Sequence, residues 1–336
     1  MRLSVLDQTP VPQGSSPATA LRNSIDLAQH AERLGYHRFW VAEHHNMGGL
    51  AGSSPEILIG HIAENTDRIR VGSGGVMLTH YSPLKVAENF RMLEALHPGR
   101  IDLGLGRAPG SDHVTANALA RGGQRLSIEY YPTMIQELRQ LLHDRVPDDG
   151  PLRGIQARPQ TEFAPEMWLL ASSEDSAAIA SHFGLPLSWA HFINPHGAQV
   201  CRAYTEQFTP SFSHTEPSLS ICAAVLCAAT TEEANVLATS LKMWRARGLQ
   251  GPIPSPAEAE TLADAAAKNP LTVSVPPERE KPLIVGNPAE VKRQISETAE
   301  MYGADEVVIV SICHDHDARV RSYELVSEAF ALTTSA

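Results

Sequence analysis

Residues 71–107 read VGSGGVMLTHYSPLKVAENFRMLEALHPGRIDLGLGR. The stretch predicts a strand, a loop, a helix and a second strand. The first strand, 71–77, is apolar apart from one serine and three glycines, and glycines inside a strand indicate backbone that approaches another group closely. Ser82 and Pro83 are residue types that begin a helix, and Pro98-Gly99 ends it.

The second strand of this stretch, 101–106, alternates apolar residues with Asp102, Gly104 and Gly106. Because neighbouring side chains on a strand point to opposite faces, one face is almost empty of side chains and could carry a flat ligand. Arg107 follows at the carboxyl end, where its guanidinium could bind an anionic group of that ligand.

The composition is that of a globular enzyme with a sizeable core. Of the 336 residues, 43% are hydrophobic and 19% are charged, which argues against disorder. The formal net charge of -11 leaves no basic surface for nucleic acid or for an acidic membrane. We therefore expect small molecules or other subunits as partners.

The cysteines and the N-terminus favour a cytoplasmic location. Four cysteines, at 201, 222, 227 and 313, show neither CxxC pairing nor the density of a disulfide framework. The chain starts without a signal peptide, and no apolar run approaches the roughly 18 residues that span a bilayer.

Strand and helix patterns alternate along the whole chain. The predicted strands are 3–6, 39–42, 71–77, 101–105, 168–171, 187–190, 220–229 and 306–311. Eight such units in one composition regime predict a single α/β domain over 1–336, a (β/α)8 TIM barrel with insertions. Residues 108–124 are expected to form a loop. The proline-rich residues 251–282 are expected to form an insertion with a helical patch, a mobile lid.

Active sites of such barrels lie at the carboxyl ends of the strands. Several polar or glycine-containing segments follow predicted strands directly: Glu43-His44-His45, Gly74-Gly75, Gly106-Arg107 and Ser172-Ser173. The fold and the residue types therefore point to the same rim of the barrel.

Some motifs allow more than one interpretation. GLGRAPG at 104–110 misses the dinucleotide fingerprint by one position. Ser172, Ser173 and Ser176 begin a helix after a strand, where hydroxyls and backbone N–H groups can bind phosphate, although N-capping explains one of them. His191 and Phe192 are either substrate contacts or packing residues. The run 313–316 contains metal-ligating residue types, but in a polar turn, so no metal site is predicted.

Taken in order, several segments resemble the luciferase-like monooxygenase family, flavin-dependent enzymes related to bacterial luciferase. They are AEHH at 42–45, VGSGGVML at 71–78, GRIDLGLGR at 99–107, LLASSEDSA at 169–177 and VGNPAEV at 285–291. The resemblance covers nearly the whole chain and implies a (β/α)8 barrel that binds reduced FMN across its third and fourth strands. Gly106 stands where bacterial luciferase has a reactive cysteine, so light emission is not expected.

The resemblance also assigns individual residues. His44 matches the catalytic histidine, and Gly74-Gly75 matches a non-prolyl cis peptide beside the flavin ring, with Met77 next to it. The positions that match phosphate-binding residues are Arg107, Arg125, Ser172, Ser173 and Ser176. The candidates for substrate contacts are His45, His80, His191 and Phe192.

The activity that the resemblance implies is monooxygenation. Reduced FMN from a separate flavin reductase would react with O2 to give a flavin C4a-peroxide, which oxidises a small organic substrate. One alternative is hydride transfer with the deazaflavin F420, and another is flavin binding without turnover. The helices at 54–65 and 83–96 are expected to form the contact of a homodimer, because both are apolar on more than one side.

Overall fold

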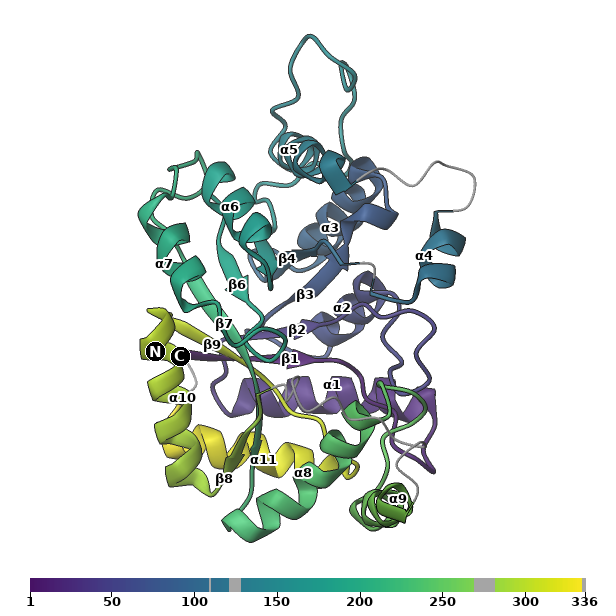
Figure 1. Cartoon of the computed structure of the whole chain (residues 1–336). Coiled ribbons are helices and arrows are strands. Elements are labelled where there is room, and N and C mark those ends of the chain that lie inside the picture. The colour runs from purple at the N-terminus through teal and green to yellow at the C-terminus, as the bar shows by residue number, and fades with distance from the viewer. Residues whose placement is uncertain (109, 121–127, 269–281, 334–336) are drawn as a thin grey trace.

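The computed structural model describes residues 1–108, 110–120, 128–268 and 282–333. Its barrel strands are β1 (Arg2–Asp7), β2 (Arg38–Val41), β3 (Arg70–Met77), β4 (Ile101–Gly106), β5 (Glu166–Ala171), β6 (Leu187–Trp189), β7 (Leu219–Cys227) and β9 (Glu306–Val310). They are parallel and pair in that order, and β9 pairs again with β1, so the sheet closes (Figure 1). The predicted (β/α)8 barrel and its eight strands are confirmed.

Helices surround the barrel and mostly follow the strands one by one (Figure 1). They are α1 (Pro17–Arg33), α2 (Pro55–Glu64), α3 (Pro83–Leu96), α5 (Tyr131–Leu142), α6 (Glu174–Phe183), α7 (Ala198–Glu206), α8 (Thr231–Ala246), α10 (Pro288–Tyr302) and α11 (His316–Phe330). Proline occupies one of the first helical positions in α1, α2, α3, α5 and α10, where its missing N–H costs no hydrogen bond. Asn287 and Glu290 form a capping box at the start of α10.

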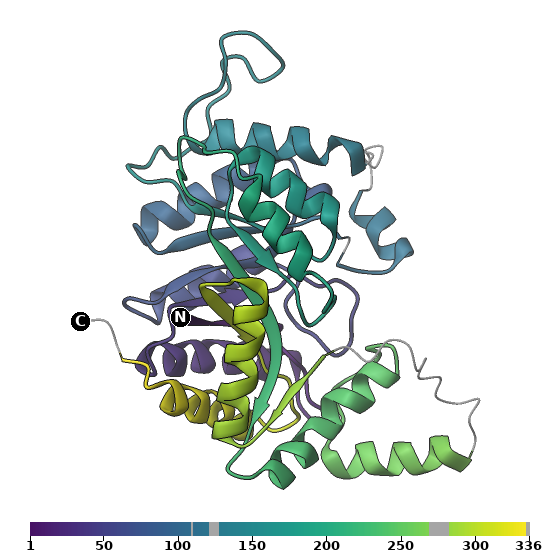
Figure 2. The same ribbon diagram turned by 60° about the vertical axis from the view of Figure 1, so that its left-hand side comes forward.

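Two short elements differ from the sequence prediction. The expected loop 108–124 contains a helix, α4 (His113–Leu119), because the Asp112 carboxylate caps it by accepting a hydrogen bond from the Thr115 N–H at 2.9 Å. The strand β8 (Ile284–Gly286) was not predicted and pairs with the end of β7. The helical patch of the insertion is α9 (Pro256–Lys268), which packs on α8 (Figure 2). Residues 269–281 of the expected lid lie outside the described residues.

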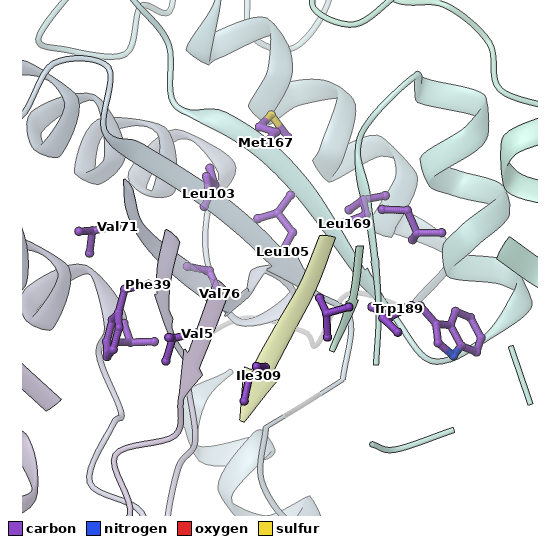
Figure 3. Close-up of a cluster of buried hydrophobic side chains, with 14 of the residues drawn as sticks. Val5, Phe39, Val71, Val76, Leu103, Leu105, Met167, Leu169, Trp189 and Ile309 are labelled. Atoms are coloured by element: carbon purple, nitrogen blue, oxygen red, sulfur yellow. The ribbon is translucent and has the colours of Figure 1, made fainter. Parts of the chain in front are cut away.

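The apolar core has two layers that follow from the alternation of strand residues. Outward residues such as Val5, Leu103 and Ile309 pack under the helices (Figure 3). Inward residues such as Trp40 and Trp168 form a separate cluster inside the barrel, with ring centroids 5.4 Å apart. This second layer is the floor beneath the carboxyl ends of the strands.

Below the apolar floor, the barrel interior holds a buried ion network. Arg38 donates hydrogen bonds of 2.8 Å each to the Asp102 and Glu306 carboxylates, and its guanidinium lies 4.6 Å from the Trp168 ring. Arg70 also pairs with Asp102. A buried arginine with such partners satisfies charges that would otherwise be costly to remove from water.

This network corrects the expectation that one face of β4 is nearly empty. The Asp102 side chain forms ion pairs with Arg38 and Arg70 on that face. A Cβ atom on Gly104 would clash with the Ser73 carbonyl oxygen of β3. Gly104 therefore permits close approach of two strands at the register shift between Gly74 and Val76, rather than contact with a ligand.

No helix in the described ranges is long and apolar enough to cross a membrane. All four cysteines are buried and have free thiols.

Candidate active site

A cavity of about 1100 Å³ lies at the carboxyl ends of the barrel strands. It exceeds the roughly 300 to 1,000 Å³ of an ordinary ligand pocket, so it has room for a cofactor and a substrate together. The predicted site residues on its wall are His44, His45, Gly74, Gly75, Met77, Arg107, Ser172, Ser173, Ser176 and Phe192. Residues distant in the sequence are thus brought together at the rim where the fold predicted them.

One end of the cavity suits an anion. Arg107 donates a hydrogen bond of 2.9 Å to Ser173 Oγ, which lies 3.3 Å from Ser176 Oγ. Ser173 is the N-cap residue of α6, but its side chain makes no capping bond and instead bonds Arg107 and Ser176 at the cavity. A guanidinium, two hydroxyls and a helix N-terminus together match a phosphate group. The Asp175 carboxylate lies 3.4 Å from Arg107 but is mostly exposed to solvent. Arg125, the second predicted cation, lies outside the described residues.

Gly74 and Gly75, near the end of β3, add no side chains to the cavity wall. The Gly74-Gly75 peptide bond is cis, as the resemblance implied. A Cβ atom on Gly74 would lie 2.6 Å from Leu6 Cδ1, and one on Gly75 would lie 2.6 Å from the Gly104 carbonyl oxygen. Gly75 therefore requires glycine because its clash is with backbone, whereas a side chain at Gly74 would require the end of the Leu6 side chain to shift.

His44 follows β2 and lines the same cavity. Its backbone N–H donates to the Gly52 carbonyl oxygen at 2.8 Å, while its buried Nδ1 has no hydrogen-bond partner among the described residues. Burial, and to a lesser extent the charge of His45, lowers the pKa of the His44 imidazole to about 4. The ring is therefore neutral near pH 7 and can accept a proton or a hydrogen bond.

This shift predicts a pH dependence of stability. The pKa of His44 is about 4 in the folded state and 6.5 ordinarily, so the unfolded state binds more protons between these pH values. Stability therefore falls as the pH drops from about 6.5 to about 4. Between about pH 7 and pH 5 the free energy of unfolding of the wild type should fall on the order of 1 to 2 kcal/mol more than that of a His44→Gln variant. Urea unfolding at both pH values measures this difference, and equal losses in the two proteins would contradict it.

Sequence reasoning assigned no role to Glu43, although it named the Glu43-His44-His45 segment. The Glu43 carboxylate is buried in the cavity wall and is 2.7 Å from His45 Nε2. His80, which was also predicted as a substrate contact, is not among the residues that line the cavity. Its ring packs edge to face with that of His45, with ring centroids 6.1 Å apart.

His191 is also absent from the cavity wall, unlike its neighbour Phe192. Its Nδ1 lies 3.1 Å from the Tyr302 hydroxyl, and the two rings pack edge to face. The predicted substrate contact is corrected for this residue, because successive side chains here point in different directions and only one faces the cavity.

The helix α8 contributes wall residues that sequence reasoning missed. Leu241, Trp244 and Arg245 line the cavity, and the Trp244 indole donates a 2.9 Å hydrogen bond to the Gly251 carbonyl oxygen. Their spacing of three to four residues places them on one helix face, and this periodicity was the available signal. Residues 313–316 serve the structure, since the Asp315 carboxylate caps α11 and His316 Nε2 lies 2.8 Å from Asp26.

Comparison with known proteins agrees with this geometry. The model of the luciferase-like monooxygenase family matches residues 1–306. The N-acetyl-S-alkylcysteine monooxygenase of Bacillus subtilis is 36% identical, and the alignment covers 98% of each chain. The crystal structure of apo-MsnO8 superimposes with a TM-score of 0.88 at 38% identity and covers 99% of each chain.

More distant structures share the fold. The oxygenating constituent of 3,6-diketocamphane monooxygenase from Pseudomonas putida, solved with FMN, gives a TM-score of 0.68 at 19% identity over 98% of each chain. An F420-dependent secondary alcohol dehydrogenase with an F420-acetone adduct gives 0.67 at 15% identity, also over 98% of each chain. The family match, the full-length relatives and the cavity at the expected rim agree: the chain belongs to the luciferase-like monooxygenase family.

Proposed function

We propose that the protein is a monooxygenase that uses reduced FMN and O2 to oxidise a small organic substrate. The observation that carries this proposal is the arrangement of one cavity: an anion site at Arg107 and Ser173, a bare wall at Gly74-Gly75, and a neutral histidine, His44. These three features suit the phosphate, the flat ring and the proton chemistry of a flavin reaction.

The described residues fit FMN. Arg107, Ser173 and Ser176 would hold the phosphate, and the wall at Gly74-Gly75 would face the ring. When bound, the reduced flavin supplies the electrons that activate oxygen. The protein binds and orients the cofactor, and the apolar floor around Trp40 and Leu6 keeps water away from it.

His44 serves as the proton acceptor or hydrogen-bond acceptor at the cavity wall. Its neutral imidazole has a buried Nδ1 without a partner among the described residues. A base in a water-poor cavity acts on a proton within hydrogen-bond reach.

Anaerobic titration tests the cofactor. The proposal expects tight binding of reduced FMN, saturating at one equivalent per chain, and weaker binding of reduced F420. An oxygen pulse should then oxidise substrate in the FMN complex. Preferred binding of F420 with substrate oxidation in the absence of oxygen would favour the hydride-transfer alternative, and binding without turnover of any substrate would favour a flavin-binding protein.

The substrate and partners follow from the same proposal. N-acetyl-S-alkylcysteines, named for a relative of 36% identity, are the first substrates to test. A separate flavin reductase would supply the reduced FMN. A cytoplasmic location fits the four free thiols.

A homodimer is the proposed assembly. The packed helices α2 and α3 expose Ile57, Met92 and Leu96, whose exposed fractions are 65%, 54% and 67%. An isologous contact would cover this apolar surface. Light scattering at micromolar concentration should give about twice the chain mass of 36.4 kDa.

Ile57→Asp should shift the dimer toward monomer because it places a charge in the contact. The matched control is Val236→Asp, which changes an exposed residue of α8. A wild-type monomer at all concentrations, or equal effects of the two variants, would contradict the proposed interface.

A further inference from the structure

The Glu43 carboxylate connects three segments, two of which line the cavity. Oε1 lies 2.7 Å from His45 Nε2 and accepts a 2.8 Å hydrogen bond from the Tyr81 hydroxyl, and Oε2 accepts a 2.9 Å hydrogen bond from the Met77 N–H. His45 lies in the loop after β2, Met77 ends β3, and Tyr81 precedes α3. One side chain thus fastens the loop that carries both histidines to the strand that carries Gly74 and Gly75.

Burial of the Glu43 carboxylate makes these hydrogen bonds necessary. Glu43 is 1% exposed, and a buried carboxylate is tolerated only when its oxygens accept hydrogen bonds. The contacts just described supply three donors. Among these three donors only His45 can carry a positive charge. Its attraction to the Glu43 carboxylate favours the orientation in which Nε2–H points at Glu43.

The orientation of the His45 ring follows from this bond. Since Glu43 as a carboxylate only accepts, the Nε2 atom must be the donor, which fixes the proton of the neutral ring on Nε2. The remaining ring nitrogen, Nδ1, is then the hydrogen-bond acceptor of the neutral ring, and His45 lines the cavity. The His45 backbone N–H is also held, by the Gly110 carbonyl oxygen at 3.0 Å.

The two adjacent histidines therefore have different surroundings. His44 is buried with an unpartnered Nδ1, whereas His45 is bound to a carboxylate. Neighbouring titratable groups whose environments differ in this way commonly divide acid and base roles.

We propose that Glu43 is a positioning residue, which fixes the His45 tautomer and the Met77 amide so that His45 forms a second proton-handling group beside His44. The proposal rests on the proposed function for its role in turnover. Its structural part, the fixed tautomer, stands on the described contacts alone.

Nitrogen-15 NMR of histidine-labelled protein without flavin tests the structural part. The His45 signals are assigned by their loss in His45→Asn. In the wild type, brought to an alkaline pH at which the nitrogen shifts of His45 show a neutral ring, His45 should show the Nε2–H tautomer. In Glu43→Gln, whose amide can also donate, this single tautomer should give way to a mixture or to Nδ1–H. The Nδ1–H tautomer in the wild type, or an unchanged tautomer in Glu43→Gln, would overturn the proposal.

Tyr81→Phe is the matched control, because it removes one donor to Glu43 but keeps the bond to His45. It should leave the His45 tautomer as in the wild type. If Glu43→Gln does not fold, the wild-type spectrum still decides the tautomer.

Kinetics test the role in turnover. With an N-acetyl-S-alkylcysteine as probe, Glu43→Gln should lower kcat by about tenfold or more, with KM and reduced-FMN affinity within about threefold of wild type. Unchanged kcat would overturn the role. If the wild type binds no reduced flavin, the proposed function fails, whereas the NMR result still decides whether Glu43 positions His45.

Discussion

His44→Ala should oxidise substrate about 10² to 10⁴ times more slowly than the wild type, the usual contribution of a general acid or base. The Nδ1 atom of His44 is buried and lacks a hydrogen-bond partner among the described residues, and His44 lines the cavity. The low pKa of about 4 keeps the ring neutral throughout the physiological pH range. Single-turnover product formation with reduced FMN and O2 measures the effect.

The control for this prediction is His182→Ala, which changes an exposed histidine at the end of α6. Its turnover should match the wild type. His44→Ala should still bind reduced FMN, because the anion site is separate from the histidine loop. Normal turnover in His44→Ala would contradict the assigned role, and loss of flavin binding would show that the histidine acts on binding instead.

Arg107→Ala should weaken FMN binding about tenfold to a hundredfold, because a charge-assisted hydrogen bond contributes roughly 1.5 to 3 kcal/mol. Riboflavin lacks the phosphate, so its affinity should hardly change. The dissociation constants of both flavins can be compared by fluorescence titration. The comparison separates the contribution of the phosphate to binding from that of the flavin ring.

Arg293→Ala provides a matched loss of an arginine from an exposed i,i+4 ion pair on α10. It should leave both affinities unchanged. Equal losses for FMN and riboflavin in Arg107→Ala would rule out a phosphate role for this arginine.

The fold could be predicted because its signals are local and repeated. Each apolar strand run, each Ser-Pro or Asn-Pro helix start and the order of the units were readable from neighbouring residues. The strand β8 was missed because it has only three residues and pairs with the end of β7, which is distant in the sequence. The helix α4 was missed because one cap, at Asp112, stabilises a short segment that the glycine-rich context disfavours.

Residues of the cavity wall could be predicted where they follow a strand directly, as at His44, Gly75 and Arg107. Side-chain positions that depend on contacts between residues distant in the sequence could not be predicted. The pairing of Asp102 with Arg38 spans 64 residues, and the bond from Tyr81 to Glu43 spans 38. The outward packing of His191 against Tyr302 spans 111 residues and likewise could not be read from the local pattern.

Oxygen isotope incorporation tests the central claim most directly. The protein, reduced FMN and an N-acetyl-S-alkylcysteine are mixed with ¹⁸O2, and the mass of the product is measured by mass spectrometry. A monooxygenase should give a product that carries one labelled oxygen atom and should give none under argon. Substrate oxidation that proceeds without O2, or a product that carries no label, would contradict the account.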